Sequence, residues 1–479
     1  MDLSCLKQTA NKNNNRSERP VSLNQKTMIT CSQKQQNYHS EKKSLLMKNY
    51  TLIIALAAVI LLSGCAQSGE TGELVGATSS RGSWVEQTPF GMAFVKRGAI
   101  RVGPSDEDPT SGINPTRSVT IEAFWMDDTE VTNNEYRQFT NWVRDSIARK
   151  LLYNSSNANA QYYARLDLDG NYIGINWDEP IDWTDTLALE DLYLPAQDRF
   201  FGTRQIDTRK LYYDYAWIDL QKAARRSNKY NYDEQSYGNN IDSRADFIVH
   251  ERTHAYPDTL VWIRDFTYSY NEPHTSKYFW HVGFDNYPVV GVTWDQARAF
   301  CQWRTQMQNN FLQGQRLATV MDYRLPTEYE WEYAARGGLQ NAMYPWGGYY
   351  SRNQMGEFMA NYKPMRGNYA EDGGMYTMKV AEYPPNDFGL YDMAGNVAEW
   401  TITAYDELSQ SMVNELNPDF QYNAQDSDPP ALKRKVIRGG SWKDVGFYTQ
   451  VSTRTFEYQD SATSYVGFRT IRSSFGNEF

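Results

Sequence analysis

Apolar residues recur at helical spacing behind three threonines, each of which has the surroundings of a helix start. Each threonine is followed at the third position by Glu or Gln, the capping-box spacing in which two side chains satisfy backbone N–H groups of the first turn. The three pairs are Thr132 and Glu135, Thr293 and Gln296, and Thr327 and Glu330. The apolar residues behind them are Tyr136, Phe139 and Val143, then Ala297, Phe300 and Cys301, then Trp331, Ala334 and Ala335. We therefore predict three helices, and the third should end at Gly337 and Gly338.

Alternating segments predict strands ahead of the first helix. Residues 89–103 contain two short apolar runs with glycine-bearing turns, which indicates two strands. Residues 117–127 tend toward alternation of apolar and polar positions, which indicates one further strand. Its shared face would consist of Val119, Ile121, Ala123 and Trp125.

Residues 149–277 differ in composition from the rest of the chain. They are rich in Tyr, Asp, Asn and Arg and show little sustained periodicity. A linker would lack so many aromatic residues, so we interpret the segment as an insertion or subdomain. Exposed aromatic residues beside Arg and Asp favour a protein interface, whereas a Tyr-rich satellite core would bury them, and the composition leaves both open. The candidate partner contacts are Tyr212, Tyr213, Tyr215 and Trp217.

The beginning of the chain has the pattern of an export signal behind a polar extension. A basic start and the short apolar run 51–62 predict a secretory signal over residues 47–64, too short to span a membrane comfortably. The run closes on Leu-Ser-Gly-Cys, which is similar to a bacterial lipobox, so we expect Cys65 to be acylated and to anchor the chain. Residues 1–46 would then be an over-extended gene start, and residues 65–87 a lipidated tether.

Net charge and cysteine content limit the possible partners and bonds. The 479 residues carry a formal net charge of −10. Residues 1–64 hold nine Lys or Arg and three Asp or Glu, so the remainder carries −16, which argues against a nucleic-acid partner. Of the four cysteines, only Cys301 follows Cys65, so no internal disulfide is expected in the folded part. Its place on an apolar helical stripe predicts a packing role.

Residues 386–400 mix aromatic, glycine and oxygen-bearing residues in a way that neither an amphipathic helix nor a plain strand requires. Gly395 suits a turn with positive φ or a close backbone approach. Asp392, Asn396 and Glu399 place three oxygen-bearing side chains within eight residues. Such a segment could be a cation-binding loop or a hydrogen-bonded loop held by aromatic residues, and both interpretations stay open.

Six motifs in order resemble the formylglycine-generating-enzyme-like, or sulfatase-modifying-factor, family. They lie at residues 288–297, 324–338, 344–347, 386–400, 438–442 and 466–469. The resemblance implies a compact α+β domain, related to C-type lectins, with little regular secondary structure. The domain would comprise residues 88–148 and 278–475, with the aromatic-rich residues 149–277 as a large insertion.

The chemistry implied by this resemblance is incomplete in the present sequence. Formylglycine generation needs a pair of cysteines that bind copper, between the Arg-Gly-Gly-Ser motif and the final Gly-Phe-Arg. Residues 443–465 contain no cysteine, and Thr449, Val451 and Ser452 occupy the neighbourhood. Hydroxyl and apolar groups cannot replace a thiolate in copper or redox chemistry, so we expect no copper and no enzyme activity.

The same resemblance implies calcium sites that do not depend on the cysteines. The matching residues are Asn361, Tyr362, Asp372 and Gly374 in one loop, and Asp392, Gly395, Val397 and Glu399 in another. Side-chain oxygens and backbone carbonyls are the ligands that Ca²⁺ takes. The alternative is that these residues only cap turns.

Together with the lipobox and the insertion, the motifs also resemble the GldK/PorK-type lipoprotein family of gliding motility and type IX secretion. This resemblance implies an outer-membrane lipoprotein facing the periplasm. It would form a ring with a GldN/PorN-type periplasmic protein and bind inner-membrane motor components of the secretion system.

Two other functions compete with this scaffold role. His250, Glu251 and His254 have the spacing of a zinc-dependent hydrolase, with Glu272 as a conceivable third ligand. That chemistry requires a helix, and Pro257 follows almost at once without an apolar helical stripe, so we favour a polar turn. The remaining alternative is a glycan- or peptide-binding lectin-like module.

Overall fold

The computed structural model describes residues 86–104, 116–155, 159–239 and 241–475, all within one compact unit, Val85–Phe479. The predicted signal, the acylation site Cys65 and most of the tether lie outside the described residues. Within the described part, no helix is both long and apolar enough to cross a bilayer.

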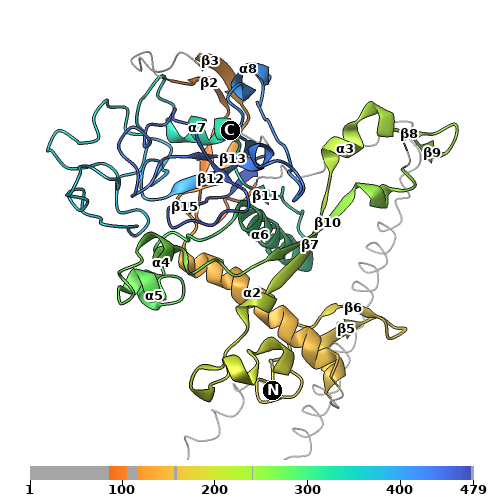
Figure 1. Ribbon diagram of the computed structural model, residues 1–479. Coiled ribbons are helices and arrows are strands. Elements are labelled where there is room, and N and C mark those ends of the chain that lie inside the picture. Colours follow the sequence, from red (N-terminus) through yellow and green to blue (C-terminus); the bar gives the residue numbers. More distant parts are fainter. Residues whose placement is uncertain (1–85, 105–115, 156–158, 240, 476–479) are drawn as a thin grey trace, which may run out of the picture. The chain divides into compact units, whose positions relative to one another are not determined.

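All three predicted helices form and begin at their predicted caps (Figure 1). They are α2 (Asn133–Tyr153), α6 (Trp294–Gly314) and α7 (Glu328–Ala335), each with a complete capping box. Helices α2 and α6 pack through the stacked rings of Tyr136 and Phe300, whose centroids are 5.6 Å apart. Helix α7 ends as predicted, because Gly337 and Gly338 take positive φ angles of 59° and 89°.

Two four-stranded sheets lie beside these helices. The first has the order β1 (Met92–Val95), β4 (Phe124–Asp127), β16 (Ile471–Ser473) and β11 (Tyr323–Arg324), and is antiparallel throughout. The second has the order β14 (Thr455–Tyr458), β13 (Arg434–Arg438), β12 (Ala398–Ala404) and β15 (Val466–Gly467), and only its β12–β15 pair is parallel. Residues 468–470 connect β15 with β16 and so pass from the second sheet to the first.

The two strands expected within residues 89–103 are confirmed, but the single strand expected over residues 117–127 is wrong. The second strand of the first segment, β2 (Gly98–Val102), pairs with β3 (Arg117–Ile121), whereas β4 belongs to the first sheet. The alternation breaks because Ala123 and Phe124 are both buried, and Trp125 is only half-buried. Residues 117–127 therefore contribute strands to two sheets, whereas the alternation predicted a single strand.

Residues 149–277 form several small elements around the end of α2. Strands β5 (Ala164–Leu166) and β6 (Tyr172–Ile175) make a short hairpin. Strands β7 (Tyr212–Ile218) and β10 (Ile248–His254) pair antiparallel over seven residues each. Beyond them lie α3 (Leu220–Ala224), β8 (Tyr230–Asn231) and β9 (Ser236–Tyr237). We refer to residues 212–254 as the arm, which projects from α6 with α3, β8 and β9 at its outer end (Figure 1).

The remaining elements are short. The α-helices are α4 (Val261–Asp265), α5 (Pro273–Lys277) and α8 (Ser409–Met412). The 3₁₀ helices are η1 (Ala160–Tyr163), η2 (Glu190–Leu192), η3 (Ala196–Asp198), η4 (Phe200–Gly202), η5 (Thr208–Lys210), η6 (Arg226–Asn228), η7 (Arg244–Phe247), η8 (Val282–Phe284) and η9 (Pro430–Lys433). Long loops between them hold most of the candidate site residues.

The main hydrophobic core extends from α2 and α6 into the arm. Tyr213 and Tyr215 of β7 belong to the same buried cluster as Phe139, Phe300 and Cys301. The predicted packing role of Cys301 is confirmed, since its side chain is 2% exposed. The base of the arm is therefore part of the domain core rather than a separately packed subdomain.

Candidate functional site

A buried ion pair on β12 lies at the centre of the candidate site. Glu399 accepts hydrogen bonds of 2.7 and 2.8 Å from Arg469, and one of 2.7 Å from Nε1 of Trp331 on α7. All three side chains are fully buried. Arg469 reaches this position because residues 468–470 run between the two sheets, and it also donates to the carbonyl oxygen of Tyr391 at 2.9 Å. The pair thus ties the loop before β12 to both sheets.

Glu130, which the sequence motifs did not single out, completes the polar centre. Its carboxylate accepts a hydrogen bond of 2.7 Å from Nδ2 of Asn396 and one of 3.1 Å from the backbone N–H of Val397. Burial, together with the charges of Asp392 and Glu399, raises the pKa of Glu130 well above its ordinary value. The available signal was an acidic residue two positions before the first capping box, and nothing in the sequence linked it to residues more than 260 positions away.

Two asparagines join the two loops that were predicted to bind calcium. The backbone N–H of Asn396 donates to the carbonyl oxygen of Asn361 at 2.7 Å, and Nδ2 of Asn361 donates to Oδ1 of Asn396 at 3.2 Å. Gly395 is required here, because a Cβ atom on it would lie 2.3 Å from the Asn361 carbonyl oxygen and its φ is +78°. The structure therefore brings the two loops together.

The first loop has one feature that suits a cation. Asp372 accepts the backbone N–H groups of Tyr362 at 2.7 Å and Gly374 at 3.3 Å, so its carboxylate caps the loop. By contrast, Oδ1 of Asn361 is buried and has no hydrogen-bond partner among the described residues. It lies 2.9 Å from the position of a Cβ atom on Gly374, so the four predicted residues converge. An unpaired buried carbonyl oxygen beside a carboxylate fits a Ca²⁺ ligand set.

In the second loop, several carboxylate oxygens already accept hydrogen bonds from the protein. Oδ2 of Asp392 accepts the backbone N–H of Ala381 at 2.7 Å, and burial raises the pKa of Asp392 to about 6. Glu399 already accepts three hydrogen bonds, which leaves one of about four lone-pair positions on its carboxylate. Gly395 and Val397 could contribute only backbone carbonyl oxygens. Three buried acids share the charge of Arg469, so burial and mutual repulsion favour the protonated forms of Glu130 and Asp392.

The positions near which the family has its cysteine pair hold packed, non-reactive groups. Thr449 and Val451 are buried, Oγ1 of Thr449 donates to the carbonyl oxygen of Gly446 at 2.9 Å, and the N–H of Val451 donates to that of Met343 at 3.0 Å. Ser452 is half-buried. The free cysteine of the described chain, Cys301, lies on α6, where burial raises the pKa of its thiol.

The zinc-hydrolase alternative is wrong in its geometry, because residues 250–254 are a strand rather than a helix or the polar turn we favoured. All of β10 pairs with β7, so Glu251 points to the opposite face from His250 and His254. Glu251 accepts a hydrogen bond of 2.9 Å from Nε1 of Trp217, while Nε2 of His254 lies 2.7 Å from the carbonyl oxygen of Thr208. Within the described ranges, no three His, Cys, Asp or Glu residues are grouped to hold a metal.

Of the four aromatic residues predicted to contact partners, the structure removes two from the surface. Tyr213 and Tyr215 are 5% and 8% exposed and pack against α2 and α6, so they are not surface contacts of this chain. Trp217 is half-buried beneath Arg298, 5.4 Å from its guanidinium carbon, and Tyr212 is 39% exposed. The strand alternation decides this, since residues 213, 215 and 217 face the core.

Comparison with known proteins identifies the family of this chain. The model of the sulfatase-modifying factor enzyme 1-like domain matches residues 83–474, so the chain belongs to that family. Among solved structures, PvdO from Pseudomonas aeruginosa resembles it with a TM-score of 0.41 and 16% identity, over 80% of this chain and 94% of that one.

Curated relatives include both inactive and active proteins. The inactive C-alpha-formylglycine-generating enzyme 2 of Bos taurus is 37% identical over 189 residues, which are 38% of this chain and 49% of the relative. The formylglycine-generating enzyme of Bos taurus is 34% identical over 194 residues, or 38% of this chain and 43% of the relative. The chain thus spans about half the length of the curated relatives it matches.

Proposed function

We propose that this chain is a non-catalytic member of its family that acts as a structural, self-associating lipoprotein. The observation that supports this most is the absence of a thiol near Thr449 and Val451, whose side chains are packed and, for Thr449, hydrogen-bonded. A fold kept intact without its reactive pair can still present surfaces for assembly.

The lipobox-like sequence and the motif resemblance support a particular setting for this role. Cys65 would anchor the chain to the outer membrane, with the folded part facing the periplasm. There it would form a ring with a GldN/PorN-type protein and contact inner-membrane motor components of the type IX secretion and gliding machinery.

The absence of catalysis can be tested directly. A sulfatase-derived peptide that contains the substrate cysteine would be incubated with the chain, oxygen and copper, and the product mass measured. We expect no conversion, while an active family enzyme serves as the positive control. Aldehyde formation that depends on the added chain would overturn the non-catalytic assignment.

The structural role is tested by gentle extraction from membranes. Particle size and protein composition in mild detergent should reveal large assemblies that contain a second protein. Cys65→Ala should release the chain from the membrane fraction, because it removes the acylation site. A lone monomer after gentle extraction would contradict the scaffold role.

We also propose that Ca²⁺ stabilises the two joined loops. Asn361, Tyr362, Asp372 and Gly374 would hold one ion, and Asp392, Gly395, Val397 and Glu399 the other. A bound divalent cation would favour the ionised forms of these carboxyls, which burial and mutual repulsion otherwise disfavour. Equilibrium dialysis should show calcium binding that Asp372→Asn weakens at the first loop and Asp392→Asn at the second. Binding unchanged in both variants would reject these sites.

A further inference from the structure

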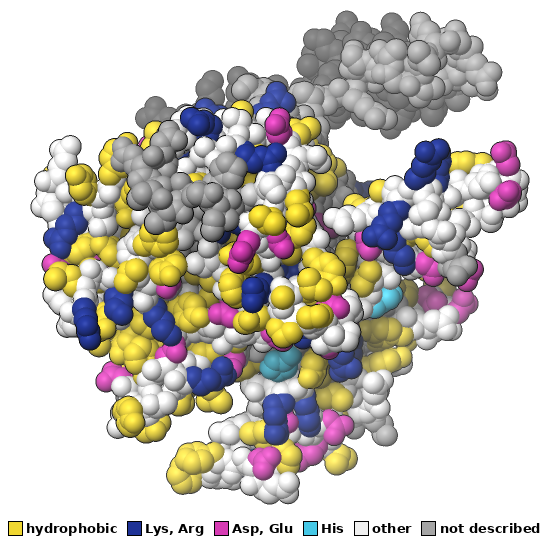
Figure 2. Space-filling model, turned by 45° about the horizontal axis from the view of Figure 1, so that its top comes forward, with side chains coloured by type: hydrophobic (Ala, Val, Ile, Leu, Met, Phe, Trp, Pro, Cys, Tyr) yellow, Lys and Arg dark blue, Asp and Glu magenta, His cyan; other side chains and the backbone are white. Residues whose placement is uncertain are grey.

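The outer end of the arm carries basic side chains without a partner. Arg225, Arg226 and Lys229, here called the basic turn, are exposed. Within the described chain, none of the three forms an ion pair. Figure 2 shows Lys and Arg side chains on the projecting arm, beside acidic ones at its outermost end. Apolar side chains accompany them, because Ile218 is 59% and Leu220 is 70% exposed. Exposed charges beside exposed apolar groups are typical of a docking element.

A groove of about 1030 Å³ runs along β10 from Val249 to His254, between this strand and the loops that contain residues 423–426 and 459–462. Its volume is near the upper limit of roughly 300–1,000 Å³ for small-molecule pockets, so it suits a protein segment. Asp295, Asp426 and Asp460 lie along it, and we call this the acidic groove.

The acidic groove has an excess of negative charge. Its arginines are already paired: Arg209 with Asp207 at 2.8 Å, Arg252 with Asp214 at 3.6 Å, and Arg264 with Asp258. Asp426 is exposed and forms no ion pair with any described residue. Asp295 and Asp460 have only distant partners, Arg298 at 3.8 Å and Lys433 at 3.7 Å. Burial, together with the charges of Glu251 and Asp426, raises the pKa of Asp295 to about 6.

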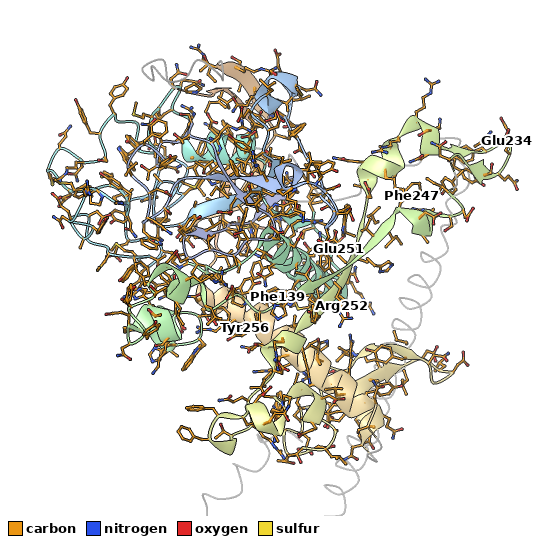
Figure 3. The ribbon with its side chains drawn as sticks, viewed as in Figure 1. Phe139, Glu234, Phe247, Glu251, Arg252 and Tyr256 are labelled. Atoms are coloured by element: carbon orange, nitrogen blue, oxygen red, sulfur yellow. The ribbon has the colours of Figure 1, made fainter. Side chains whose placement is uncertain are left out.

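Among the described residues, the basic turn of a molecule forms no ion pair with the acids of its own groove. The core end of β10 is fixed beside Asp295, since Nε2 of Gln296 donates to the carbonyl oxygen of His254 at 2.9 Å. The outer end is marked by the bond from the N–H of Asp219 to the carbonyl oxygen of Phe247 at 2.8 Å. Six strand steps of about 3.3 Å separate the two ends by roughly 20 Å. Figure 3 shows Glu234 at the outer end and Glu251 and Arg252 near α6.

We propose that the basic turn of one molecule docks into the acidic groove of a second copy of this chain. The two surfaces are different patches, one beyond the outer end of β10 and the other along that strand and the core loops. The contact is therefore head-to-tail, and each molecule uses both of its patches. Unpaired charges of opposite sign steer the encounter, and Ile218 and Leu220 supply apolar contact at its edge. The inference rests on the proposed self-association and assigns its interface.

A charge exchange tests this interface in the full-length chain, extracted in mild detergent and analysed by sedimentation velocity. The tip variant carries Arg225→Glu, Arg226→Glu and Lys229→Glu, and the groove variant carries Asp426→Lys and Asp460→Lys. Each alone should weaken self-association at least about tenfold, because like charges then face each other. A mixture of the two variants should assemble with the two proteins alternating, since the acidic tip of one fits the basic groove of the other, and the basic tip of the second fits the acidic groove of the first. The combined variant, in which both patches are reversed, should regain the wild-type assembly size.

A matched control carries the same change of charge elsewhere. Lys96→Glu, Arg101→Glu and Lys150→Glu alter three exposed basic residues outside the arm, and the wild-type assembly size should persist. Thermal unfolding monitors the fold of every variant. Wild-type assemblies that all variants retain would overturn this interface while leaving the structural role intact. Loss in both single-patch variants without recovery in the combined one would also overturn it. A monomeric wild-type chain would overturn the proposed function itself.

Discussion

At the scale of single residues, the charge balance around Glu399 governs the stability of the centre. Among the described residues, Arg469 is the cation that contacts Glu399 directly, and its charge also lowers the cost of burying Glu130 and Asp392. Breaking such a pair from one side leaves an uncompensated charge in the interior, which costs far more than the pair itself contributes.

Replacing Arg469 should therefore destabilise the domain severely. We expect Arg469→Met to lower the free energy of unfolding by about 3–5 kcal/mol, as measured by urea denaturation. Arg165→Met removes the exposed ion pair with Asp178, whose side chains are 62% and 88% exposed, and should cost less than about 1 kcal/mol. Equal effects of the two changes would show that the buried pair has no special role. Glu399→Gln combined with Arg469→Met should cost less than the two separate losses together.

The raised pKa of Asp392 predicts an unusual dependence on pH. Between its ordinary value of 3.8 and about 6, the folded protein holds a proton on Asp392 that the unfolded chain has released. The contribution of this residue to stability therefore falls as the pH rises through that window. Asparagine removes the titration and tolerates the φ of +54° at this position.

With a chelator present, Asp392→Asn should thus gain stability relative to the wild type as the pH increases from 4 to 7. Urea unfolding at several pH values measures the difference. A difference that stays constant over this range would contradict the prediction. Saturating calcium should reduce the advantage of the variant, because the cation favours the ionised carboxylate.

At the scale of elements, the sequence predicted the helices whose ends are fixed by contacts between neighbouring residues. The capping boxes located α2, α6 and α7 because each cap is satisfied within one turn. Strand β7 escaped notice because its exposed positions include Tyr212, Ala216 and Ile218, so apolar residues occupy both faces and hide the alternation. Residues 250–254 were predicted as a polar turn, because no local feature indicates their pairing with β7.

The sequence identified the loops of the candidate site but not the contacts that these loops make. Residues 386–400 were recognisable from composition and motif order, and the structure joins them to Asn361 as one polar centre. Glu130 and the arm's attachment to α6 depend on pairs far apart in the chain, which a single sequence does not reveal.

Glu251 should hold the arm to the domain core. It binds Tyr215 and Trp217 from its own sheet and Arg298 of α6 at 3.5 Å. Glu251→Ala leaves these donors unpaired, at a cost of about 1–3 kcal/mol, so amide hydrogen exchange in β7 and β10 should accelerate while α7 stays protected. His250→Ala, on the opposite face of the strand, is the control and should leave the exchange rates unchanged. Equal protection in Glu251→Ala would show that packing alone fixes the arm.

At the scale of the whole molecule, the first sheet depends on its last strand. Strand β16 lies between β4 and β11, and the backbone N–H of Asp127 also donates to the carbonyl oxygen of Thr470 at 3.0 Å. Truncation after Thr470 removes this internal strand, and we expect an insoluble or unfolded chain by circular dichroism. Truncation after Phe475 removes only residues beyond the described structure and should preserve the spectrum. If the chain truncated after Thr470 folded, β4 and β11 would keep their positions without β16.

The position of β16 also sets the order of events during biosynthesis. Strands β1 and β4 leave the ribosome more than 340 residues before the strand that pairs with β4, as the register of Met126 with Ile471 requires. Until then β4 presents an open edge, which is a template for pairing with other chains. Contacts of such sequence separation also slow folding. We therefore expect the nascent chain to benefit from binding factors that cover this edge until synthesis is almost complete.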